Sequence, residues 1–282
     1  PALRKKLLTP ANYTVLILMA LVALFPIYFM LIASFKNTED LFRNGIQMVF
    51  EFDNLTAANY EYTLTTKDGI YLQWYWNSII VLVASTVCSL GLSSICGYAI
   101  GAYDFKGKNF LFVLTMIVMM IPIEFLLIPL YKMIINMQLI DTKTGSILPF
   151  VVQPTAMFFF QQYVRGIVRG YMEAARVDGA NAFVIMFKIM LPLARPVVVL
   201  TAVNVFIGQY NDYGTALIYI WNEKYYTLSV GLYYKYLAPG AESIDANVQY
   251  AAGVLVMLPM VVIFALFQKQ LINGIVTSGM KL

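Results

Sequence analysis

Residues 109–131 read NFLFVLTMIVMMIPIEFLLIPLY and contain a single carboxylate, that of Glu124. An apolar run of about 20 residues is long enough to cross the hydrocarbon core of a bilayer as a helix. Five other stretches of the sequence are similarly apolar, so we expect six membrane-spanning helices. The six expected spans are 12–34, 75–101, 109–131, 145–164, 194–220 and 248–272. The sequence therefore predicts an all-α membrane protein.

The composition of the chain supports this class and excludes others. Of its 282 residues, 60% are hydrophobic and 12% are charged, and the mean hydropathy is +0.72. A soluble domain is about a quarter charged, so a globule of this composition would expose large apolar patches. Histidine is absent, which removes most metal sites and catalytic triads. We expect no catalytic residue, no metal, no cofactor bound by this chain, and no nucleic-acid partner.

The distribution of Lys and Arg predicts the orientation of the spans, because these residues concentrate in cytoplasmic loops. With the N-terminus inside, the inner segments hold twelve of the nineteen cations and three carboxylates. The outer segments then hold seven cations and ten carboxylates. Both termini are expected in the cytoplasm. Because no soluble insertion or long linker interrupts the spans, residues 1–282 are expected to form one transmembrane domain.

Two patterns within the spans predict how the helices pack. Small residues recur every fourth position in the second span, at Ser85, Ser89, Ser93, Gly97 and Gly101. Such a stripe favours close helix packing, although a face lining the substrate path is the alternative. We expect Cys88 and Cys96 in the same span to be small buried residues, too far apart along a helix to form a disulfide.

Prolines interrupt several of the expected spans. Each proline removes a helical N–H and frees a carbonyl that lipid cannot satisfy. Pro122, Glu124 and Pro129 together make the third span the best candidate for a bent helix that lines a cavity. A purely structural kink is the alternative.

The loop at 165–193 predicts a helix, a turn and a second helix. Residues 172–177 favour a helix, with Glu173 in the first turn, where the helix dipole favours an anion. Gly179 can adopt the left-handed conformation that ends a helix, and Asp178 or Asn181 can cap the next one. A short charged helix with small residues can fit a groove on another protein. The alternative is an amphipathic helix that lies on the membrane.

This loop resembles the EAA loop of ABC-importer permeases through Glu173-Ala174-Ala175, Asp178-Gly179-Ala180 and Leu191-Pro192. Further matches cover nearly the whole chain and are similar to the six-span, MalG-like permease subunits of carbohydrate importers. They are Asn59-Tyr60, Asn77-Ser78, Gly97-Tyr98-Ala99, Phe105-Lys106-Gly107-Lys108, Ile121-Pro122, Ile128-Pro129-Leu130-Tyr131, Asp141-Thr142 and the ending from Gly274 to Lys281.

The resemblance implies import of a sugar or oligosaccharide across a bacterial cytoplasmic (inner) membrane. It implies a second, MalF-like permease subunit, two ATPase subunits and an extracytoplasmic solute-binding protein as partners. The sequence has no phosphate-binding loop of the Gly-x-x-x-x-Gly-Lys-Ser/Thr type, so ATP and Mg are expected to be used by the partner ATPase. The residues implied to couple to the ATPase are Glu173, Ala174, Ala175, Asp178, Gly179, Leu191 and Pro192. The tail from Asn273 to Leu282 resembles tails that reach between the ATPase subunits, and a disordered end is the alternative.

One departure from the family concerns the fifth span. The family usually has Trp-Asn before an acidic or similar residue, whereas this chain has Tyr210-Asn211-Asp212. Tyrosine keeps a flat face for sugar stacking but adds a hydroxyl group. The candidates for the substrate pathway are Glu124, Gln153, Asn204, Gln209, Tyr210, Asn211 and Asp212, each of which could instead form an interhelical hydrogen bond.

Other transport functions compete with sugar import. An ABC permease for another solute, such as an amino acid, a metal, a polyol or glycerol phosphate, would have the same loop. A secondary transporter could use Glu124 or Asp212 as an ion site, but an ion-coupled carrier needs no ATPase-docking helix. A membrane-embedded enzyme is disfavoured by the lack of histidine and of clustered intramembrane carboxylates.

Overall fold

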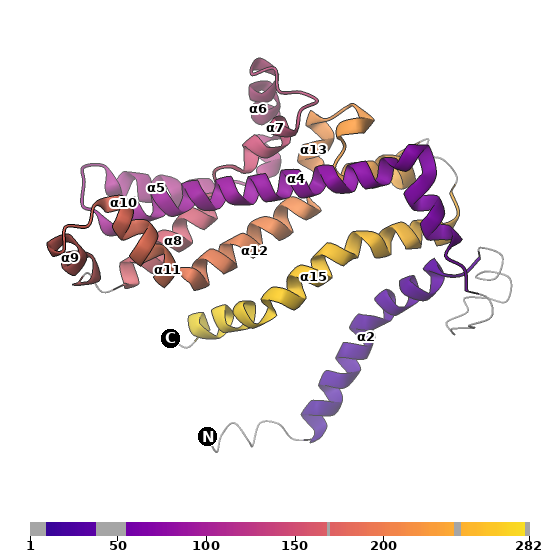
Figure 1. Ribbon diagram of the computed structural model, residues 1–282, viewed down its shortest axis with the longest axis horizontal. Coiled ribbons are helices and arrows are strands. Elements are labelled where there is room, and N and C mark those ends of the chain that lie inside the picture. The colour runs from indigo at the N-terminus through magenta and orange to yellow at the C-terminus, as the bar shows by residue number, and fades with distance from the viewer. Residues whose placement is uncertain (1–9, 38–54, 168–169, 240–243, 280–282) are drawn as a thin grey trace. The chain divides into compact units, whose positions relative to one another are not determined.

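The computed structural model describes residues 10–37, 55–167, 170–239 and 244–279. All regular secondary structure in these ranges is helical, as expected (Figure 1). The contacts group the chain into two compact units. The first comprises Pro1–Leu72 and Lys235–Pro259, and the second comprises Gln73–Tyr234 and Met260–Leu282.

The first unit contains α2 (Pro10–Ser34) and the first parts of α4 (Ala58–Ala102) and α15 (Ala246–Gly279). Polar side chains satisfy the carbonyls at the end of α2. The Asn59 amide donates to the carbonyls of Ser34 and Lys36, both at 2.9 Å, and the Asn247 amide also donates to the Lys36 carbonyl. Because helix ends leave carbonyls unpaired, these amides fix the end of α2 on α4 and α15.

The second unit contains the remainder of α4 and a series of shorter helices. Two pairs of consecutive helices are sharply bent. The bend between Lys108–Met119 and Ile123–Asn136 is 104°, and the bend between Ala182–Leu193 and Arg195–Asn211 is 79°. In chain order the elements are α5 (Lys108–Met119), α6 (Ile123–Asn136), α7 (Lys143–Ile147), η2 (Leu148–Phe150), α8 (Pro154–Gly166), α9 (Gly170–Val177), α10 (Ala182–Val184), the π-helix η3 (Ile185–Met190), α11 (Leu191–Leu193), α12 (Arg195–Asn211), α13 (Gly214–Tyr219), η4 (Glu223–Tyr225) and α14 (Leu228–Leu232). The second unit also includes the part of α15 from Met260 onward. The π-helix η5 (Tyr233–Leu237) begins in the second unit, and its last three residues belong to the first.

The small-residue stripe of α4 is largely buried, and its Gly97–Gly101 end packs against α8. Ser85, Ser89, Ser93 and Gly97 are buried, and a Cβ atom added to Gly97 would lie 2.6 Å from the Phe160 Cβ. Only glycine therefore permits this approach of the two helices, which confirms the packing prediction. The expectation that Cys88 and Cys96 are buried is wrong, because both lie off the stripe and are exposed.

Three helices in the described part of the chain are long and apolar enough to span a membrane, or up to five elements if each bent pair is counted as one span. The three are Asn12–Ser34, Ala58–Ala102 and Ala246–Gln268. The expected span 145–164 is instead divided into α7, η2 and α8, because Pro149 and Pro154 begin new helical segments. The number of six spans stays a prediction. The expected C-terminal tail is helical up to Gly279, and its last three residues lie outside the described residues.

Candidate functional site

Residues 170–193, named here the EAA segment, fold as two helices joined by a tight turn. The Gly179 N–H donates to the Arg176 carbonyl at 3.0 Å and the Ala180 N–H donates to the Ala175 carbonyl at 2.9 Å. This bond pair is a Schellman motif, which requires a left-handed residue at the position of Gly179. Gly179 has φ +81°. Asn181 caps the next helix, since its Oδ1 accepts from the Val184 N–H at 2.9 Å. The predicted helix–turn–helix is confirmed.

The inward face of the EAA segment packs into a core that it shares with α4 and α8. Ala175 is only 7% exposed in this core. The shared core consists of Tyr98, Val164, Met172, Ala175, Ile185, Met186 and Met190. The two alanines of the motif therefore differ, because Ala175 packs within its own chain whereas Ala174 is exposed.

Aromatic contacts fix the edges of the EAA segment. The Arg176 guanidinium lies over the Tyr103 ring, 5.4 Å from its centroid, and the Tyr103 ring packs edge-on against Tyr98 at 5.5 Å between centroids. The Tyr163 hydroxyl donates to the Leu193 carbonyl at 2.8 Å. Sequence reasoning missed Tyr103 because nothing in a single sequence pairs it with Arg176.

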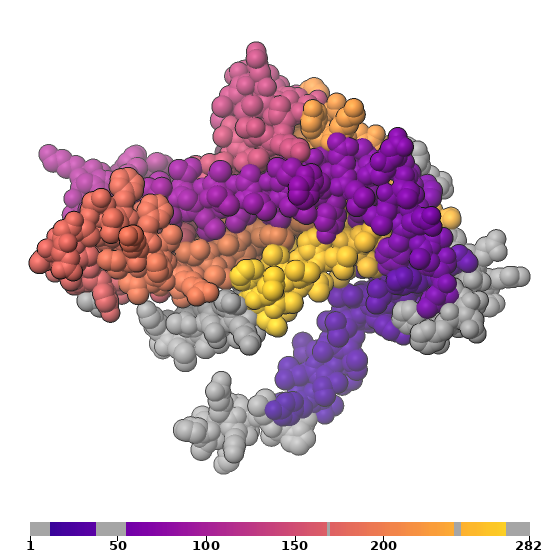
Figure 2. Space-filling model, in the orientation of Figure 1, coloured from indigo at the N-terminus to yellow at the C-terminus, as the bar shows by residue number. Residues whose placement is uncertain are grey.

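The outward face of the EAA segment exposes apolar side chains beside charged ones. Val177 is 88% exposed and Phe183 is 70% exposed, and Glu173 and Asp178 are exposed next to them. Figure 2 shows the segment from α9 to α11 at one end of the second unit. Large exposed apolar side chains of this kind are candidates for contact with a protein or a membrane. The sequence analysis did not single out Phe183, and the signal that could have found it is a large hydrophobic residue in a polar loop.

The end of the EAA segment leads directly into α12. Leu191 and Pro192 form α11, and Leu191 is half-buried while Pro192 is exposed. The preceding six residues form a π-helix, a geometry that often occurs at functional sites. The connection from α9 to α12 therefore consists of short, consecutive helical elements.

The pathway candidates of α12 fall on two different faces. Asn204 and Asn211, seven residues apart, are exposed together with Gly208 between them. Each asparagine amide donates to the carbonyl four residues earlier, at 2.9 Å. Gln209 and Tyr210 are buried. The exposed face of α12 is thus defined by Asn204, Gly208 and Asn211.

The buried candidates make contacts within the chain. Tyr210 stacks on Phe206 at 5.7 Å between ring centroids, and the Asp212 Oδ1 accepts from the Thr215 N–H at 3.2 Å. The Gln153 carbonyl accepts from the Ser93 hydroxyl at 3.4 Å, and Glu124 is exposed in the first turn of α6. The pathway role of the seven candidates stays a prediction.

Comparison with known proteins identifies the family. Residues 89–276 match the family described as "Binding-protein-dependent transport system inner membrane component". The chain belongs to this family. It is 38% identical over 262 residues to the arabinooligosaccharides transport system permease protein AraQ of Halalkalibacterium halodurans, covering 93% of this chain and 92% of the relative.

Other relatives transport different solutes by name. The diacetylchitobiose uptake system permease protein NgcG of Streptomyces coelicolor is 26% identical and covers 95% of this chain and 87% of that protein. The sn-glycerol-3-phosphate transport system permease protein UgpE of Brucella abortus is 29% identical and covers 95% of each. A solved bacterial ABC transporter that imports the acidic polysaccharide alginate contains a chain of the same fold, with a TM-score of 0.82, 22% identity and coverage of 92% of this chain and 94% of that chain.

Proposed function

We propose that this chain is a permease subunit of an ATP-driven importer for a sugar or oligosaccharide. It forms half of the translocation pathway, with a second, MalF-like permease subunit as the other half. An extracytoplasmic solute-binding protein delivers the solute, and two ATPase subunits hydrolyse ATP. The observation that carries the proposal is the 38% identity to an arabinooligosaccharide permease over 93% of the chain.

The outward face of the EAA segment is the proposed contact with one ATPase subunit. Exposed Val177 and Phe183 supply apolar area, and Glu173 holds a basic ATPase residue at the rim, where charges set specificity. Ala174 permits close approach. The inward core then transmits ATPase closure to α4 and α8, and Leu191 and Pro192 transmit it to α12. A shift between inward-facing and outward-facing states requires contacts that differ between them.

The exposed face of α12 is the proposed contribution to the pathway. Asn204 lies in the middle of α12 and Asn211 at its end, and polar amides on an apolar helix favour a protein or aqueous neighbour over lipid. Each asparagine uses its amide nitrogen on its own helix, which leaves the amide oxygen to accept from a sugar hydroxyl. Gln209, Tyr210 and Asp212 support this face from the buried side.

The second candidate solute is sn-glycerol 3-phosphate, favoured by the 29% identity to UgpE over 95% of both chains. Both candidates use the same subunit arrangement, so they differ only in the solute. A larger solute needs a wider path between the two permease subunits.

Uptake by the complete transporter in proteoliposomes tests the proposal. We expect uptake of an arabinooligosaccharide that needs both ATP and the cognate binding protein, with sn-glycerol 3-phosphate as the comparison solute. Dissipating the ion gradient should leave uptake unchanged. Uptake without ATP that stops when the ion gradient collapses would identify a secondary transporter and overturn the proposal.

A further inference from the structure

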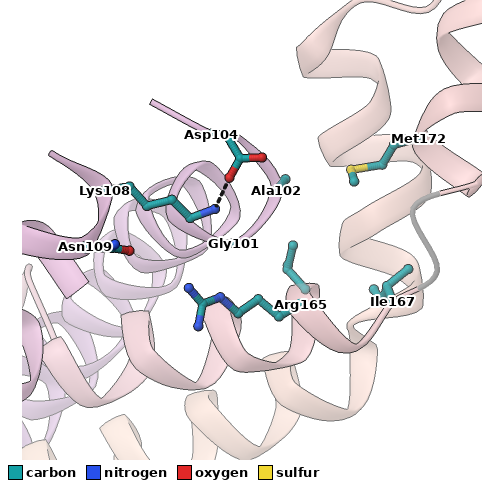
Figure 3. Close-up of a pocket in the computed structure, with 9 residues that line it drawn as sticks. Gly101, Ala102, Asp104, Lys108, Asn109, Arg165, Ile167 and Met172 are labelled. Atoms are coloured by element: carbon teal, nitrogen blue, oxygen red, sulfur yellow. Dashed lines mark hydrogen bonds and ion pairs between the residues drawn. The ribbon is translucent and has the colours of Figure 1, made fainter. Parts of the chain in front are cut away.

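A polar cavity of about 430 Å³ lies beside the root of the EAA segment. It opens where α4 ends, α5 begins and α8 ends, and all of its lining residues belong to the second unit. Figure 3 shows the charged ends of Lys108 and Arg165 on the same side of this cavity, near the Asn109 amide. Met172 of α9 lines the cavity as well. Neither the proposed pathway nor the outward face of the EAA segment includes this cavity.

Lys108 brings an ammonium group to the cavity. Its side chain is only 13% exposed, and its Nζ donates to the Asp104 Oδ1 at 2.9 Å. The Asp104 side chain is 77% exposed, and an ion pair with such an open partner is weak and screened by salt. An ammonium carries three N–H donors. Lys108 therefore has donors for a second anion without giving up Asp104.

Arg165 brings a second cation from a different helix. Its guanidinium lies over the Phe112 ring, 5.2 Å from the ring centroid. Within the described residues this ring contact is the interaction that holds Arg165, and no carboxylate there pairs with it. Stacking uses the face of the guanidinium and leaves the N–H donors at its edge, in the fork that matches a phosphate.

The backbone around the cavity adds to the positive potential. Lys108 and Asn109 are the first residues of α5, whose N-cap residue, Gly107, has no side chain to accept from the first-turn N–H groups. Helix N-termini favour anions. On the other wall, a Cβ atom on Gly101 would lie 2.9 Å from Val164, so α4 and α8 are in close contact there and hold Arg165 in place. Among the described residues that line the cavity, Lys108, Arg165 and Asp104 are charged, and their charges sum to one positive charge.

We propose that this cavity binds a phosphate group, and that its source is the headgroup of an anionic phospholipid. This proposal rests on the proposed function and on the orientation predicted from the distribution of Lys and Arg. Together they place the cavity at the cytoplasmic surface of the membrane, where basic pockets between helices bind such headgroups. The volume corresponds to roughly 14 water molecules at about 30 Å³ each, more than a bare phosphate requires and enough for glycerol phosphate. Because Met172 joins the cavity to the core of the EAA segment, the bound headgroup stabilises that core.

Lipid titration of the assembled transporter tests the site. The transporter is placed in nanodiscs of phosphatidylcholine containing increasing fractions of phosphatidylglycerol, and retained lipid is counted by native mass spectrometry. Arg165→Gln should weaken phosphatidylglycerol retention about tenfold, the loss expected for one charge-assisted contact. Lys106→Gln is the control for loss of one positive charge. Lys106 is exposed in the connection between α4 and α5 and is not among the described residues that line the cavity. This control should bind as the unaltered protein does.

A second set of measurements separates the source of the phosphate and guards against misfolding. In pure phosphatidylcholine, Arg165→Gln and Lys106→Gln should have equal thermal stability. If Arg165→Gln is less stable, Lys108→Gln provides an independent test of the cavity. Stabilisation by phosphatidylglycerol but not by inorganic phosphate supports the headgroup. Stabilisation by inorganic phosphate alone, or equal lipid retention by all variants, would overturn the headgroup site. Loss of the ATPase subunits from Arg165→Gln with unchanged lipid retention would instead assign Arg165 to a protein contact. These readouts do not depend on the transported solute.

Discussion

The EAA segment and the exposed face of α12 differ in how far contacts within this chain stabilise them. The inner side of the EAA segment is complete within this chain, with its own turn, cap and buried core. The face of α12 carries Asn204 and Asn211 with hydrogen bonds only to their own helix. Under the proposed function, the EAA segment meets the ATPase as a preformed surface, whereas the α12 face acquires its role only opposite a second permease subunit. A preformed surface loses less conformational entropy on binding.

The largest effect is expected from a substitution that breaks the turn at Gly179. Gly179→Val should reduce ATP-dependent uptake about tenfold or more, because a left-handed backbone costs an L-residue about 1–2 kcal/mol and a β-branched residue more. Hydrolysis should no longer respond to the loaded binding protein. Uptake and ATPase rates of the reconstituted transporter provide the measurement.

Gly179→Asn is the matched control, since asparagine tolerates this conformation. It should retain most of the coupling. Normal stimulation of hydrolysis in Gly179→Val would contradict the role given to the turn.

The next prediction compares the two alanines of the motif. Ala175→Leu inserts a large side chain into the packed core and should lower the unfolding free energy by about 1–3 kcal/mol. Ala174→Leu should leave thermal stability unchanged and instead reduce co-purification of the ATPase subunits, because Ala174 lies on the outward face. Thermal unfolding and subunit stoichiometry distinguish the two variants. Equal loss of stability in both would remove the distinction between the faces.

The smallest expected effect is on the α12 face. Asn204→Leu and Asn211→Leu should raise the KM for uptake severalfold, because each removes one hydroxyl-binding amide worth about 0.5–1.5 kcal/mol. ATPase binding should not change. Leu200→Val is the control for a change in side-chain volume near Asn204. In this variant the backbone carbonyl at position 200 can still accept from the Asn204 amide. An unchanged KM in both asparagine variants would assign this face to subunit packing rather than to the solute.

The sequence predicted local features better than distant ones. Gly179 and Asn181 could be placed because turn and cap chemistry depends on a few adjacent residues. The inward position of Ala175 and the contact between Arg176 and Tyr103 could not, since they depend on α4 and α8 meeting the loop. The small-residue stripe predicted close packing but did not name its partner, α8. The expected span at 145–164 is broken at Pro149 and Pro154. Hydropathy alone does not predict these breaks, because it measures how apolar a stretch is and not where proline interrupts a helix.

The hydrogen bonds at the end of α2 impose an order on biosynthesis. Of the two amides that donate to the Lys36 carbonyl, one belongs to Asn247, 211 residues further along the chain. At a synthesis rate of about 5–20 residues per second, the ribosome needs roughly 10 to 40 s to cover that distance. The ribosome therefore completes α2 long before Asn247 can donate to the Lys36 carbonyl, and a nascent chain truncated before α15 leaves that carbonyl without the Asn247 amide.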